Sequence, residues 1–92
     1  MTGPDVNRVV RAFVGPDGRW VRIPARRGKR LILLDRLAQQ FEPGETYPET
    51  EVNNRVRAFH DDVAALRRYL VVEGFLDRRD GWYWRSGGSV DV

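Results

Sequence analysis

The stretch from Tyr47 to Arg85 constrains the fold more than any other part of the chain. It predicts two amphipathic helices, from about Pro48 to Phe59 and from Asp61 to Glu73, with only a tight turn between them. Two short runs rich in apolar and aromatic residues follow, on either side of Arg79-Asp80-Gly81. An Asp-Gly pair between such runs is a strong signal for a β-hairpin. The order helix, turn, helix, hairpin is that of a winged helix-turn-helix.

The residues before this stretch predict three further elements. A helix is expected from Asp5 to Phe13, because apolar residues recur on one helical face after a Pro-Asp start. The alternating run from Arg19 to Ile23 predicts a short strand that ends at Pro24. A helix from Lys29 to Phe41 carries the widest apolar stripe and should form the centre of the core. The predicted fold is α/β and winged helix-turn-helix-like, with an N-terminal helix and strand followed by three helices and a C-terminal β-hairpin.

Length and composition predict one domain in a reducing compartment. The 92 residues should form a single domain over 1–92, with the N-terminal helix and strand in 1–24, a winged-helix core in 29–85 and a flexible tail in 86–92. There is no cysteine, the N-terminus lacks a signal-peptide pattern, and the longest apolar run, Leu31–Leu34, has four residues. We therefore expect a cytoplasmic protein with no membrane partner.

Helix ends and aromatic residues give more local expectations. Thr46 or Tyr47 should cap the helix that follows, since Thr46 and Glu49 have the spacing of a capping box. Trp82 and Trp84 should share one face of their strand. At least one tryptophan is expected in the core, because aromatic side chains dominate small cores.

The charge of the chain favours an anionic partner. Its formal net charge is +3, and its 16 basic residues are arginines apart from Lys29. The guanidinium group suits phosphates and base edges, although a bias toward arginine codons gives the same composition. Residues 19–30 contain basic side chains and no acid, whereas residues 42–51 contain acids and no base. The surface should therefore be electrostatically polarised.

Duplex DNA is the partner that this pattern predicts. In helix-turn-helix proteins the second helix of the pair lies in the major groove, so the helix from Asp61 to Glu73 is the candidate reader. The basic loop before the second helix is either an anion-binding arm beside the hairpin or a solvated charge run. The candidate nucleic-acid-binding residues are Arg55 and Arg57 from the first helix of the pair, Arg67 and Arg68 from the second, Arg78 and Arg79 from the hairpin, and Arg26, Arg27, Lys29 and Arg30 from the loop.

The head of the candidate reading helix favours a different role. Asp61 and Asp62 oppose the phosphate field, and Ala64 and Ala65, both expected on the outward side, carry no donor. The alternative is a protein-interaction module that pairs with a regulator or with a second copy of the chain. It predicts an exposed apolar patch that includes Tyr69, Val72 and one tryptophan.

Catalysis is not expected. The sequence shows no nucleophile–base pair, no metal cluster and no phosphate-binding glycine motif, so it predicts neither an enzyme nor a cofactor. His60 is the single histidine, and its neighbours Asp61 and Asp62 point in other directions. We expect His60 to be a turn or cap residue.

Several motifs resemble those of a bacterial domain of unknown function. That domain occurs alone and at the C-terminus of helix-turn-helix regulators similar to the arsenical-resistance repressors. The resemblance runs from about Phe13 to Arg85, and it implies a winged-helix-like domain associated with transcription, without an established activity. The matching motif positions Asn53, His60, Asp61, Arg67 and Arg68 form either a binding site or a structural network in which Asp61 or Asp62 pairs with Arg67 or Arg68. The resemblance rests on Glu51-Val52-Asn53, Phe59-His60-Asp61-Asp62, Leu66-Arg67-Arg68-Tyr69-Leu70, Gly74-Phe75-Leu76 and Tyr83-Trp84-Arg85.

Overall fold

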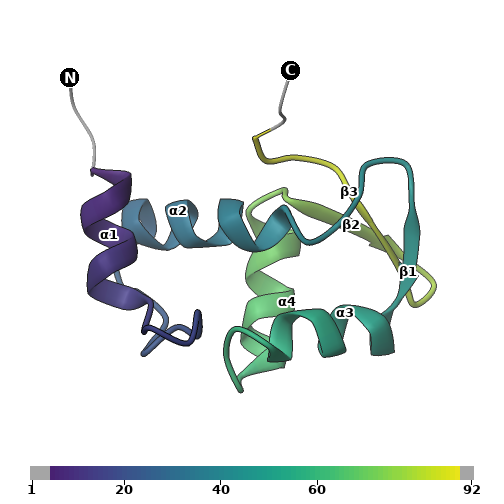
Figure 1. The fold of residues 1–92 in the computed structure, drawn as a ribbon. Coiled ribbons are helices and arrows are strands. Elements are labelled where there is room, and N and C mark those ends of the chain that lie inside the picture. Colours follow the sequence, from purple (N-terminus) through teal and green to yellow (C-terminus); the bar gives the residue numbers. More distant parts are fainter. Residues whose placement is uncertain (1–4, 90–92) are drawn as a thin grey trace.

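The computed structural model describes residues 5–89 and is a mixed α/β fold. Figure 1 shows α1 at one end, α2 running across the molecule, and a small sheet at the other end. None of the helices within 5–89 is long and apolar enough to cross a membrane. The elements of this part of the chain are α1 (Val6–Phe13), α2 (Arg27–Ala38), β1 (Thr46–Pro48), α3 (Glu49–Arg57), α4 (Val63–Val72), β2 (Leu76–Arg79) and β3 (Trp82–Arg85).

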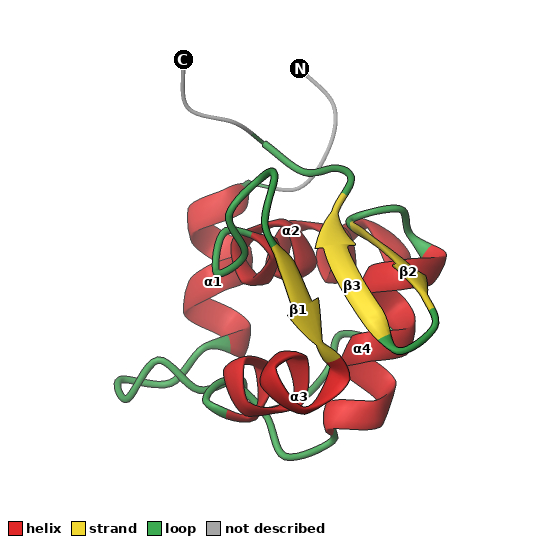
Figure 2. Cartoon of the chain, turned by 90° about the vertical axis from the view of Figure 1, so that its right-hand side faces the viewer, coloured by secondary structure: helices red, strands yellow, loops and turns green. Residues whose placement is uncertain are grey.

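The three strands form one antiparallel sheet in the order β1-β3-β2, with the helices on one of its faces (Figure 2). The β2–β3 hairpin is confirmed. Asp80 and Gly81 both have positive φ, 54° and 82°, which is the backbone of a two-residue type I′ turn. The hairpin therefore forms two of the three strands of the sheet, with its turn at one end.

Strand β1 corrects the expectation that Thr46 or Tyr47 caps α3. Thr46 pairs with Trp84 and Tyr47 with Tyr83, so these residues are extended along the edge of β3. The N-cap of α3 is Pro48, which makes no side-chain cap bond. Tyr47 is buried, and its ring meets that of Phe41 edge to face at 5.2 Å between centroids. Pairing with β3 and burial of Tyr47 therefore replace the capping box.

The expected strand from Arg19 to Ile23 is wrong. Only an isolated bridge joins Val14 to Trp20. The amide of Trp20 donates to the carbonyl of Phe59 at 2.7 Å, and that of Val21 donates to Phe13 at 2.8 Å. The amides of Trp20 and Val21 thus donate to two different segments of the chain. Within residues 5–89 the pairing therefore does not continue beyond the bridge.

Two helices begin and end at other residues than expected. Helix α2 starts at Arg27, and after Ala38 the chain closes with tighter i to i+3 hydrogen bonds that still bring Phe41 into the core. Helix α4 starts at Val63, because the carboxylate of Asp62 caps it by accepting the amide of Ala65 at 3.1 Å.

The core lies between α2, α3, α4 and the sheet. Ala65 belongs to it, contrary to the expectation that this residue faces outward. The inward face of β3 carries Tyr83, while Trp82 is 51% exposed, and the buried tryptophan is Trp20. Each fully buried large apolar side chain contributes about 1.5–3 kcal/mol. The central buried residues are Leu33, Leu34, Leu37, Ala38, Phe41, Val52, Val56, Leu66, Leu70, Leu76 and Tyr83.

Residues 86–89 fold back over the start of the hairpin and α2. Ser86 and Gly87 donate their amides to Phe75, and Ser89 donates its amide and hydroxyl to Asp35 at 2.7 and 2.6 Å. These bonds connect the first residues of the predicted flexible tail to the core. Residues 90–92 of that tail lie outside the described part of the chain.

Candidate nucleic-acid interface

A shallow groove of about 290 Å³ lies between the outer face of α4 and the β2–β3 hairpin. Helix α4 contributes Arg67 and Arg68 to it, and strand β2 contributes Arg78. The structure thus brings together three of the ten predicted basic residues, from two of the four segments of the predicted interface. The other lining residues are Ala64, Val71, Val72 and Tyr83.

Glu49 is the acid beside this groove. Its carboxylate accepts the hydroxyl of Tyr83 at 2.6 Å and lies 3.5 Å from Nε of Arg67. The hydrogen bond from Tyr83, with the charge of Arg67 as a second contribution, lowers the pKa of Glu49 below its ordinary value. Glu49 is therefore ionised at neutral pH, and it compensates part of the positive charge of the groove.

Arg67 is held from one side by α3. Its guanidinium pairs with Glu49 and donates to the side-chain oxygen of Asn53, one turn further along that helix. The expected network at the junction of the two helices is therefore present with two of its expected members, Asn53 and Arg67, but its acid differs. Glu49 and Asn53 pair with Arg67, in place of Asp61 or Asp62.

Arg68 and Arg79 project into solvent. Arg68 makes only a distant contact with the ring of Tyr69, at 5.9 Å from the centroid. The side chain of Arg79 at the hairpin tip is 84% exposed and lies 3.8 Å from the carboxylate of Asp80. Exposed ion pairs of this kind are weak, so both guanidinium groups are available to a ligand.

The acids at the head of α4 both have partners. Asp61 pairs with Arg19 at 2.6 Å, and Asp62 caps the helix. His60 accepts the amide of Asp62 on Nδ1 at 3.1 Å, which confirms it as a residue of the turn. Among residues 5–89, no group of three or more His, Cys, Asp or Glu side chains has the arrangement of a metal site.

Two other predicted basic residues lie on α3 and have structural contacts. Arg55 pairs with Glu51 at 2.8 Å, donates to the carbonyl of Gln40 at 2.6 Å and lies over the ring of Tyr47. Arg57 donates to Asn54 at 3.0 Å. The structure does not bring Arg55 or Arg57 into the groove.

The predicted basic loop is mostly helical, because Arg27, Lys29 and Arg30 lie in the first turn of α2, and this segment contacts the C-terminal end of α4. Arg27 makes a bidentate pair with Glu73, at 2.8 to 3.2 Å, and the hydrogen bond from Arg27 lowers the pKa of Glu73. Arg30 lies 3.9 Å from the same carboxylate, 4.5 Å from the centroid of Tyr69, and donates to two loop carbonyls. Arg26 is exposed, and Lys29 lies over the ring of Phe13 at 5.9 Å. Glu73 thus fixes the start of α2 near the base of the hairpin.

A family model described as an uncharacterized protein conserved in bacteria, DUF2087, matches residues 19–85. The chain belongs to this family. No curated protein and no solved structure matches it. The match confirms the resemblance to a bacterial domain of unknown function.

All the lining residues of the α4–hairpin groove lie within the segment that the DUF2087 model matches. Helix α1 lies outside it. The α4–hairpin groove is therefore built entirely by the part of the chain that defines the family.

Sequence reasoning missed Glu49 and Tyr83 as residues of the interface. Glu49 and Asn53 are four residues apart on α3, which places them on one helical face. That spacing was a signal for a shared partner. The identity of the partner, Arg67, depends on how α3 packs against α4.

Proposed function

We propose that this DUF2087 domain is a winged helix that binds duplex DNA through α4 and the β2–β3 hairpin. The order α2, β1, α3, α4, β2, β3 supports the proposal, since a winged helix has this succession of elements. The pairing of β1 with β3 also supports it. In this arrangement α4 is the helix that enters the major groove, and the hairpin is the wing that contacts the flanking backbone.

One observation carries the proposal. Arg67 and Arg68 on α4 and Arg78 on β2 meet in a single groove, and the hairpin tip extends this basic surface through Arg79. Guanidinium groups from two elements at one surface offer several charge-assisted donors to the phosphates of a duplex. Glu49 offsets only part of their charge.

These arginines have different roles in the proposed complex. Arg68 and Arg79 are exposed and contact phosphates. Arg67 is already oriented by Glu49 and Asn53, so it loses less side-chain entropy on binding.

The rest of the α4 surface is apolar. Ala64, Val71 and Val72 can contact thymine methyl groups but donate no hydrogen bonds. Affinity in the proposed complex therefore comes mainly from contacts with the DNA phosphates, and contacts with the bases contribute little.

Asp61 and Asp62, the acids expected to repel DNA phosphates, both have local partners in the folded chain. The carboxylate of Asp61 is paired with Arg19, and that of Asp62 is turned to the amide of Ala65. Both carboxylates thus have a local positive partner or donor. This reduces the repulsion that they exert on a phosphate near the first turn of α4.

Fluorescence anisotropy with a labelled duplex, repeated across a salt series, tests the proposal. With about three phosphate contacts, the logarithm of the association constant should fall with the logarithm of salt concentration with a slope of about −3. Absence of binding at low salt, or affinity that does not depend on salt, would exclude DNA as the partner.

A variant pair assigns the binding to this surface. Changing both Arg68 and Arg79 to Gln should weaken binding and reduce the salt slope by about 2, because each lost phosphate contact lowers it by about 1. The matched control is the double change of Arg8 and Arg11, exposed arginines of α1, to Gln. Equal weakening by both pairs would show that the binding is not located at α4 and the hairpin.

A second candidate function is a protein-interaction module, and the exposure of Val72 favours it. Val72 is 71% exposed and lines the groove with Val71 and Ala64. Tyr69, expected in the same patch, is half-buried beneath Arg30. If α4 pairs with a second copy of the chain, sedimentation velocity should show a dimer that Val72→Asp dissociates, whereas a monomer in both samples excludes self-association.

A further inference from the structure

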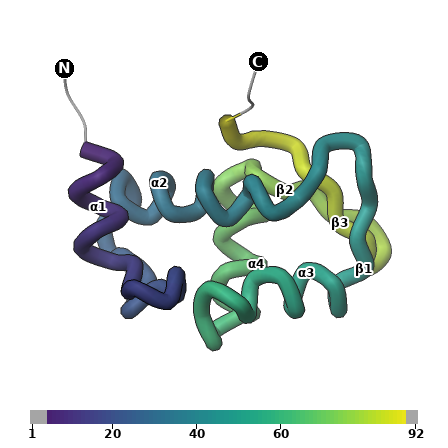
Figure 3. The backbone as a smooth tube through the Cα atoms, viewed as in Figure 1, coloured from purple at the N-terminus to yellow at the C-terminus, as the bar shows by residue number. Residues whose placement is uncertain are grey.

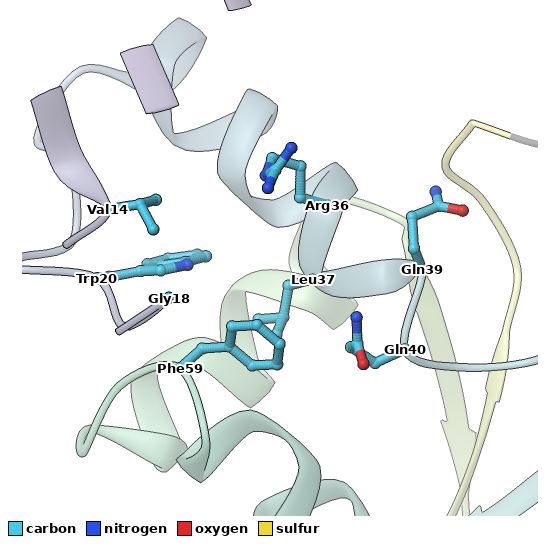
Figure 4. A pocket seen from close by; sticks show the side chains of 8 residues that line it. All are labelled: Val14, Gly18, Trp20, Arg36, Leu37, Gln39, Gln40 and Phe59. Atoms are coloured by element: carbon cyan, nitrogen blue, oxygen red, sulfur yellow. The ribbon is translucent and has the colours of Figure 1, made fainter. Parts of the chain in front are cut away.

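A second cavity, of about 270 Å³, lies away from the α4–hairpin groove and shares none of its lining residues. It is formed by the turn after α1, the C-terminal end of α2, and the turn between α3 and α4. Figure 3 shows the two turns side by side. The apolar part of its lining is Val14, Trp20, Leu37 and Phe59 (Figure 4).

The backbone around this cavity is fixed by hydrogen bonds. The amide of Trp20 donates to the carbonyl of Phe59 at 2.7 Å, and the bridge between Val14 and Trp20 closes the turn. Within the turn, Gly18 has a φ of 82°, which favours glycine. The cavity is therefore preformed, and a ligand would not need to order its walls.

Three hydrogen-bond donors at the cavity have no partner among residues 5–89. They are the indole N–H of Trp20 and, at exposed positions, the guanidinium of Arg36 and the side-chain amide of Gln40. In Figure 4 the Arg36 side chain extends toward the side of the cavity where Val14 and Trp20 lie, and Gln40 lies near Phe59. Gln39 is turned away and donates to Ser89 at 2.8 Å. The donors thus lie on both sides of the apolar lining, Arg36 with Trp20 on one side and Gln40 on the other.

Within the described part of the chain, no acid lines the cavity to compensate Arg36. Asp35 and Asp17, the acids adjacent in sequence to the lining residues Arg36 and Gly18, have partners outside the cavity. Asp35 accepts the amide and hydroxyl of Ser89, and Asp17 accepts the amide of Arg19 at 3.0 Å. The charge of Arg36 is therefore left for an anion from outside the described chain.

We propose that this cavity binds a small organic acid with a single aromatic ring. The ring lies among Trp20, Leu37 and Phe59, and the carboxylate is held by Arg36, with the indole N–H of Trp20 as a further donor. Charge-assisted hydrogen bonds to a carboxylate are stronger than neutral ones, and the apolar lining adds the burial of the ring. The volume lies just below the usual range for drug-sized ligands, which restricts the ligand to a small one. The site does not depend on DNA binding.

Calorimetric titration of the full chain with benzoate and phenylacetate tests the proposal, with benzamide and phenylacetamide as uncharged counterparts. At least one acid should bind about tenfold or more tightly than its amide, the factor expected from one charge-assisted hydrogen bond. The emission of Trp20 should change on binding, and a Trp20→Phe variant should lose that change. Failure of both acids to bind at millimolar concentration, or equal affinity of acid and amide, overturns the proposal.

Two surface variants locate the carboxylate. Arg36→Gln should abolish the preference for acid over amide, and Gln40→Glu should weaken acid binding by adding a negative charge at the entrance. Both positions are exposed, so thermal unfolding should remain unchanged. Arg8→Gln on α1 is the matched control and should bind as the original chain does. Unchanged acid binding by Arg36→Gln overturns the assignment.

Discussion

The hydroxyl of Tyr83 donates a 2.6 Å hydrogen bond to the carboxylate of Glu49, which joins the central strand to the first turn of α3. Tyr83 is buried, and the same carboxylate faces Arg67 on α4. One acid thus connects the sheet, α3 and α4. The position of α4 relative to the hairpin, and so the shape of the α4–hairpin groove, depends on this connection.

Tyr83→Phe should lower the free energy of unfolding by about 0.5–1.5 kcal/mol, the usual contribution of one intramolecular hydrogen bond. The ring and its packing remain, so the loss should come from the hydroxyl alone. Urea unfolding at pH 7 measures it. Tyr47→Phe is the comparison variant, because it removes a hydroxyl that accepts the amide of Glu42 at 2.9 Å and leaves the ring beside Arg55 in place. An unchanged unfolding midpoint in Tyr83→Phe would show that the bond to Glu49 does not stabilise the fold.

Acid should destabilise the protein through Glu49 and Glu73. Both have a pKa lowered in the folded state, Glu49 mainly by Tyr83 and Glu73 mainly by Arg27. A lowered folded pKa gives stability that is present above the unfolded pKa of about 4.3 and is lost as pH falls through the folded value. The urea midpoint of unfolding should therefore fall as the pH is lowered from 7 to 3. The decrease should occur mainly below the unfolded pKa of the two glutamates.

The variant Glu73→Gln separates this acid effect from general charge repulsion. It removes the titrating group, so its unfolding midpoint should be lower than that of the original chain at pH 7 and should change less on acidification. Glu45→Gln, at an exposed position in the loop before β1, is the control and should follow the original chain. Parallel pH curves for the original chain and Glu73→Gln would contradict the pKa argument.

Asp62→Ala should cost about 0.5–2 kcal/mol, because it removes the N-cap of α4. Asp61→Ala is the neighbouring control. Its carboxylate is exposed and only pairs with Arg19, so its loss should cost at most about 1 kcal/mol. Chemical unfolding of both variants measures the difference. A larger loss in Asp61→Ala than in Asp62→Ala would show that the link to Arg19 matters more than the cap.

Elements whose determinants are local were predictable from the sequence. The Asp80-Gly81 turn and the apolar stripe of α2 are encoded within a few residues, and both are present. Strand β1 was missed because three residues form a strand only when the edge of β3 pairs with them. The run from Arg19 to Ile23 has the right alternation, but the fold offers it no partner strand.

The sequence could predict which arginines are candidates for the interface. It could not predict which of them share one surface of the folded chain. Arg55, Arg67 and Arg68 look alike in the sequence. The fold pairs Arg55 with Glu51 and Arg67 with Glu49, and leaves Arg68 exposed. Which arginines remain available is decided by these contacts, and the contact of Arg67 joins residues 18 apart in the chain.

The adjacent arginines of α4 should therefore respond differently to the same change. Arg67→Ala should lower the free energy of unfolding by about 1 kcal/mol, because it breaks the contacts with Glu49 and Asn53. Arg68→Ala should stay within about 0.5 kcal/mol of the original chain, as exposed positions usually do. Denaturant unfolding measures both, and the labelled-duplex titration then separates stability from binding. Under the proposed function Arg68→Ala should weaken DNA binding without loss of stability. A stable Arg68→Ala variant with unchanged affinity would remove Arg68 from the interface.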